Sequence, residues 1–87
     1  MSIKQISVII CDLLTNSSFK VEAQEISSLI NEILTLPKGN DTRKLAINNL
    51  ISRCHPRWLG DYYINEIDYK KWTDLIADFK NQLKKEL

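Results

Sequence analysis

The chain has 87 residues, of which 44% are hydrophobic and 26% are charged, and its formal net charge is +1. This length provides one small domain, residues 1–87, and excludes a second one, and the composition is typical of a globular soluble protein. Charged residues interrupt the long apolar windows, which argues against both a membrane span and disorder.

The first predicted element is a helix near the N-terminus. Ser2 can cap its start, and the polar run 15–18 is expected to end it because short polar side chains compete for backbone hydrogen bonds. No small-residue cleavage site follows the apolar residues, so we expect a cytoplasmic protein. Besides Val8 and Ile9, the apolar residues that recur at helical spacing are Ile3, Ile6, Ile10, Leu13 and Leu14.

A second helix is predicted from residue 18 or 20 to residue 36. It should stop before Pro37, because proline has no backbone N–H and disfavours helical geometry in the residue before it. Pro37 and Gly39 then indicate a turn. The apolar face of this helix is predicted to hold Val21, Ile26, Leu29, Ile30, Ile33 and Leu34.

The third helix is expected to begin after Asn40 or Asp41, either of which can cap it, and to run through Arg53. Pro56 ends this helix or forms the first turn of a short new one. The apolar face is predicted to hold Leu45, Ala46, Ile47, Leu50, Ile51 and Cys54.

The last helix is predicted over residues 69–86, with Asp68 as its N-cap and lysines near its C-terminus, where they suit the helix dipole. Four amphipathic helices joined by polar turns predict an all-α fold, an antiparallel bundle of about four helices with an irregular connection at residues 54–66. The apolar face of the last helix is predicted to hold Trp72, Leu75, Ile76, Phe79 and Leu83.

The sequence offers few groups for catalysis. Cys54 and His55 are the one candidate dyad, yet adjacent residues on a helix point about 100° apart, so the two side chains would not face each other. With Cys11 added, the chain still has too few preferred ligands for a zinc site. Gly39 and Gly60 are too far apart for a phosphate-binding loop. We therefore expect no enzyme activity, no cofactor and no metal.

A basic stretch occupies residues 38–57, where five basic residues against Asp41 give a local excess of +4. Such a stretch next to Trp58 could bind a phosphate backbone, and the opposite interpretation is the solvated face of one helix and its turn. Because the whole chain is nearly neutral, we consider nucleic acid an unlikely partner. The basic residues are Lys38, Arg43, Lys44, Arg53 and Arg57.

An acidic aromatic stretch follows at residues 61–69. Tyrosines are common anchors of protein interfaces, and carboxylates around them steer a basic partner toward the surface. Alternatively, some tyrosines pack in the core and the acids cap helices, although three of each exceed what capping requires. These residues are Asp61, Tyr62, Tyr63, Glu66, Asp68 and Tyr69.

The size, the helical pattern and the Tyr-Tyr pair among carboxylates resemble bacterial toxin-immunity proteins. These include the immunity proteins of nuclease bacteriocins of the colicin type and the inhibitors of contact-dependent growth inhibition systems. The resemblance implies that the toxin is contacted by Asp61, Tyr62, Tyr63 and Glu66. Colicin-type immunity proteins are usually strongly acidic, whereas this chain is nearly neutral. The difference implies that the toxin is less basic or is contacted partly through Arg53, Arg57 and Trp58.

The expected function is therefore that of an immunity protein, which binds a cognate bacterial toxin domain stoichiometrically and neutralises it. Its partner would be a protein toxin, such as a nuclease, with no membrane and no small-molecule substrate involved. The alternative is a small nucleic-acid-binding or regulatory helical module that uses the basic stretch 38–58.

Overall fold

The computed structural model describes residues 2–54, 64 and 67–87. Within these ranges the secondary structure is helical, with no strand, which confirms the all-α prediction and all four predicted helices. No helix in this part of the chain is long and apolar enough to cross a membrane. The helices are α1 (Ile3–Asn16), α2 (Lys20–Thr35), α3 (Asp41–Arg53) and α4 (Tyr69–Glu86).

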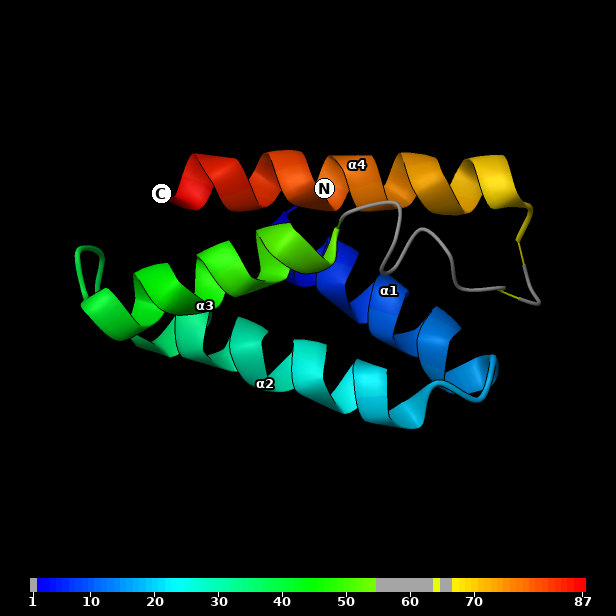
Figure 1. Ribbon diagram of the computed structural model, residues 1–87, viewed down its shortest axis with the longest axis horizontal. Helices are drawn as coiled ribbons and strands as arrows, with labels where there is room; N and C mark the ends of the chain where they lie inside the picture. The colour runs from blue at the N-terminus through cyan, green and yellow to red at the C-terminus, as the bar shows by residue number, and fades with distance from the viewer. Residues whose placement is uncertain (1, 55–63, 65–66) are drawn as a thin grey trace.

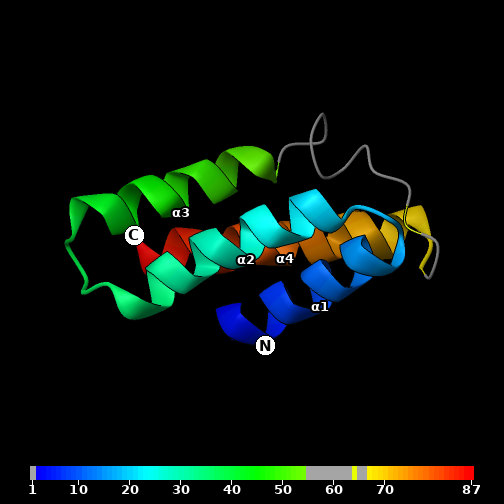
Figure 2. The same ribbon diagram turned by 90° about the horizontal axis from the view of Figure 1, so that it is seen from below.

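The four helices run alternately in opposite directions around a shared core. Helix α1 packs against α2 and α4, and α3 packs against the same two helices, so every helix has two neighbours (Figure 1). A second view, turned by 90°, shows the same arrangement (Figure 2). Each apolar stripe is thus covered by two others, as in an antiparallel bundle.

Three of the helices begin at a side-chain cap. The hydroxyl of Ser2 accepts a hydrogen bond from the backbone N–H of Gln5, and the Gln5 side chain accepts one from the Ser2 N–H, which completes a capping box. Of the two candidates for α3, Asn40 rather than Asp41 is the cap. Asp68 caps α4 as predicted, by accepting from the backbone N–H three residues along.

The two short turns follow from the residues in them. Ser18, after α1, has a positive φ of 73°, which short polar residues tolerate better than branched ones. Leu36, after α2, has an extended backbone, as the residue before a proline should. Gly39 has a φ of 87°, and the Asn40 N–H bonds to the Pro37 carbonyl at 3.2 Å to close the second turn.

The core confirms most of the predicted apolar faces and corrects three positions. Val21 and Leu45, predicted in those faces, are 62% and 71% exposed, and Leu34 is 48% exposed. Val21 and Leu45 each lie about 200° around the helix from a buried residue two positions on, so they face outward. The largest fully buried side chains are Trp72, Phe79, Ile6, Ile10, Leu14, Ile26, Ile47, Leu50 and Leu83.

Candidate functional site

The side chains predicted to contact a partner fall in the connection between α3 and α4. The structure describes the chain on either side of them and one residue among them. Cys54 and Ile64 are buried in the core, and Ile67 packs against it. These three described residues are thus part of the bundle core or in contact with it. Outside the described residues lie Arg57, Trp58, Asp61, Tyr62, Tyr63 and Glu66.

The described end of the acidic aromatic stretch contains one structural and one exposed residue. The Asp68 carboxylate accepts a hydrogen bond of 2.8 Å from the Lys71 N–H, so this acid caps a helix, as the more conservative interpretation expects. Tyr69 is 63% exposed on the first turn of α4. At least one of the three tyrosines is therefore not a core residue.

The end of α3, where the connection begins, is fixed to α2 through Arg53. Its Nε donates to Asn49 Oδ1 at 3.0 Å, and its Nη1 forms an ion pair with Glu25 Oε2. Because the guanidinium is already paired, Arg53 contributes little net positive charge to this surface. A hollow of about 350 Å³ adjoins the pair, lined by Val21, Gln24, Glu25, Ser28, Leu29, Asn49 and Arg53.

Arg43 corrects the interpretation of the basic stretch. The sequence predicts that Arg43 either binds phosphate or is solvated, but its side chain is buried. Its Nε donates to the Ile33 carbonyl at 3.0 Å, and Nη1 and Nη2 donate to the carbonyl and the carboxylate of Glu86. The stretch therefore has fewer free cations than the sequence suggests. Lys38 and Lys44 are exposed.

The position of Arg43 could have been found from the sequence. It lies three, four and seven residues before Ala46, Ile47 and Leu50, which are all buried, so it belongs to the core-facing stripe of α3. A planar guanidinium with five donors suits this place, because helix ends leave carbonyls without partners.

Both cysteines are free thiols that hold their protons. Burial raises the pKa of Cys54 to about 12, although the charge of Lys80 opposes the shift. Burial and, to a lesser degree, Asp12 raise the pKa of Cys11 to about 11. Since the thiolate is the nucleophile, neither environment activates a cysteine near neutral pH. His55, the other half of the candidate dyad, lies outside the described residues, and among those described no group of His, Cys, Asp and Glu could hold a metal.

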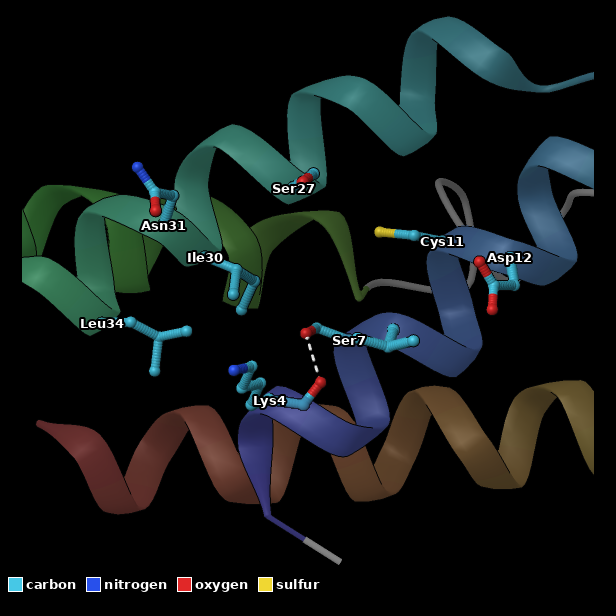
Figure 3. A pocket seen from close by; sticks show the side chains of 9 residues that line it. Lys4, Ser7, Cys11, Asp12, Ser27, Ile30, Asn31 and Leu34 are labelled. Carbon is cyan, nitrogen blue, oxygen red and sulfur yellow. Dashed lines mark hydrogen bonds between the residues drawn. The ribbon is translucent and has the colours of Figure 1, made fainter.

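A second surface feature, not predicted from the sequence, is a groove of about 340 Å³ between α1 and α2 (Figure 3). The Ser7 hydroxyl donates to the Lys4 carbonyl at 2.8 Å, and the Cys11 thiol donates to the Ala23 carbonyl at 3.5 Å. The hydrogen-bond donors of these two side chains thus have partners within the protein. The exposed apolar side chains of the groove are Val8 and Leu34. The groove is lined by Lys4, Ser7, Val8, Cys11, Asp12, Ser27, Ile30, Asn31 and Leu34.

Comparison with known proteins identifies no relative. No family model, no curated protein and no solved structure matches the chain. Its function must therefore be argued from its own residues and their geometry.

Proposed function

We propose that this protein is an immunity protein, which binds a cognate bacterial toxin domain stoichiometrically in the cytoplasm and neutralises it. The observation that carries the proposal is the exposure of Tyr69, at 63%, at the described end of the acidic aromatic stretch. Together with Tyr62, Tyr63 and the carboxylates of Asp61 and Glu66, it provides the residue types that anchor and steer a protein partner.

The packing of three described residues, next to the predicted contact side chains, in or against the core supports this choice of surface. Cys54 and Ile64 are buried and Ile67 packs against the core, so three described residues near the predicted contact side chains belong to the folded domain. Residues held in a folded core have little conformational freedom left to lose on binding, so these three add little to the entropy cost of the contact. A protein–protein interface of standard size buries about 800 Å² on each partner. The toxin contact would therefore also extend over the neighbouring helix ends.

A nucleic-acid-binding module remains the second candidate, but the described basic residues favour it less. Arg43 is buried and forms an ion pair with Glu86, and Arg53 forms an ion pair with Glu25. Phosphate binding depends on the number of cations free to neutralise phosphates, and these two are already neutralised. A titration with duplex and single-stranded nucleic acid at two salt concentrations tests this candidate, and binding that weakens steeply with salt would support it.

The immunity proposal is tested by co-expression with a candidate toxin. A suitable candidate is the C-terminal domain of a large secreted protein encoded directly upstream of this chain. We expect the chain to restore growth to cells that produce this domain and to purify with it in a one-to-one complex. Growth arrest despite abundant folded protein, with no complex recovered, would contradict the proposal for that toxin.

A further inference from the structure

The outward face of α1 carries a pattern of charge that is complementary to itself. Lys4, Val8 and Asp12 are four residues apart, so they lie in a row along one side of the helix, and all three are exposed. A cation stands at one end of the row, an apolar side chain at the middle and an anion at the other end. The two charges lie equally far from Val8, about 6 Å along the helix axis.

We propose that this face binds the same face of a second copy of the chain. The two α1 helices would lie antiparallel about a two-fold axis that passes beside Val8. Each Lys4 then meets Asp12 of the other copy, and the two Val8 side chains meet on the axis. A two-fold interface requires a surface that complements itself in this way.

Exposed apolar side chains on both sides of the row supply area for this contact. Val8 is 51% exposed, Ile9 flanks it at 38%, and Leu34 stands across the groove on α2. Burial of these side chains would drive association, whereas the exposed ion pairs would mainly fix the antiparallel orientation. The formal net charge of +1 gives little repulsion between copies.

The charge pattern favours a second copy over a partner of uniform charge. A strongly basic protein would be attracted to Asp12 and repelled by Lys4. A strongly acidic protein would be attracted to Lys4 and repelled by Asp12. An antiparallel copy satisfies both ends at once. This contact does not depend on the immunity proposal, because it uses α1 and α2 rather than the connection between α3 and α4.

Charge reversal tests the pairing in the full chain. Lys4→Asp places two pairs of like charges across the axis, and so does Asp12→Lys, so each variant should associate more than about tenfold more weakly than the parent. An equimolar mixture of the two variants restores opposite charges at both positions and should associate as the parent does. Lys44→Asp, a charge reversal on the exposed face of α3, is the matched control and should have no effect.

Sedimentation over a wide range of protein concentration measures these associations, and circular dichroism verifies that each variant is folded. A parent that stays monomeric throughout the range would overturn the proposal. Single variants that dimerise as the parent does, or a mixture that fails to regain association, would overturn it as well.

A cross-linking experiment tests the position of the axis separately. Val8→Cys should give a reducible covalent dimer when diamide oxidises the two thiols. Leu45→Cys, which replaces an even more exposed residue on α3, should not. Equal cross-linking of the two variants, or none at residue 8, would contradict the placement of the axis.

Discussion

Arg43, on the first turn of α3, and Glu86, the last residue of α4, are joined by two hydrogen bonds. Arg43 Nη2 lies 2.6 Å from Glu86 Oε2, and Nη1 lies 3.0 Å from the Glu86 carbonyl oxygen. A third bond, from Nε to the Ile33 carbonyl, adds the last turn of α2. One guanidinium on the first turn of α3 therefore satisfies the C-terminal ends of two helices, where the helix dipole favours positive charge.

Arg43→Ala should be among the most destabilising substitutions outside the apolar core. It leaves the Ile33 and Glu86 carbonyls without their partner, and an unsatisfied buried acceptor costs about 1–3 kcal/mol. We expect the free energy of unfolding to fall by about 2–4 kcal/mol in urea denaturation.

Glu86→Gln is the matched control for this prediction. The hydrogen bond from Arg43 Nη1 to the carbonyl of residue 86 remains, and the Glu86 side chain is 31% exposed. The free energy of unfolding should therefore fall by less than about 1 kcal/mol. If Glu86→Gln proved as costly as Arg43→Ala, the carboxylate rather than the two carbonyls would carry the stabilisation.

Gly39→Ala should destabilise the protein by about 1 kcal/mol for a purely conformational reason. Gly39 has a φ of 87°, and a Cβ added there would meet no atom within 4 Å, so steric crowding adds nothing. Gly39→Asn should cost less, because asparagine tolerates positive φ better than alanine. Thermal unfolding of the two variants measures the difference, and equal losses would refute the conformational explanation.

The buried thiol of Cys54 predicts a dependence of stability on pH. Burial raises its pKa to about 12 in the folded protein, from an ordinary value of 9.0, so the folded state binds the proton more tightly than the unfolded state does. The stabilisation is fully present below pH 9.0 and is lost as the pH rises toward the folded pKa. The loss should approach about 1.4 kcal/mol per pH unit between these limits.

Cys54→Ala removes this titration and isolates its effect from those of lysine and tyrosine. Unfolding free energies of the parent and the variant should therefore run parallel below pH 9.0 and converge above it. Curves that stay parallel through the alkaline range would show that the thiol does not stabilise the folded state through its proton.

The sequence predicts the helices well because periodicity and caps agree in them. In α4, Asp68 marks the start, and Trp72, Ile76, Phe79 and Leu83 mark the buried face. Prediction fails where residue type and position disagree. Arg43 is charged but lies in the buried stripe, whereas Leu45 is apolar but lies opposite that stripe. In both cases the position of the residue on the helix, rather than its polarity, determines whether its side chain is buried.

The surface features were harder to predict, because they depend on how two helices pack. The sequence shows that Val8 and Leu34 are apolar, but only the pairing of α1 with α2 brings both into one groove. In the same way, the sequence assigns a positive charge to Arg53 but does not show that Glu25, on the neighbouring helix, neutralises it.

The tyrosines of the acidic aromatic stretch provide the most direct test of the toxin-binding surface. Tyr62→Ala and Tyr63→Ala should each weaken binding of the toxin domain by more than about 2 kcal/mol, roughly thirtyfold in Kd, if they anchor the interface. Tyr69→Ala should also weaken binding, and without loss of stability, because the side chain is already exposed. Calorimetric titration measures the affinities, and Leu45→Ala, an exposed apolar residue on α3, serves as the control.

Thermal unfolding of the same variants separates a binding role from a folding role. A contact role predicts that Tyr62→Ala and Tyr63→Ala keep the parent's unfolding temperature while they lose affinity. If both variants instead fail to fold, these tyrosines belong to the core, and the surface assigned to the toxin is wrong. Affinity unchanged in all three tyrosine variants, with the fold intact, would move the toxin contact to another part of the bundle.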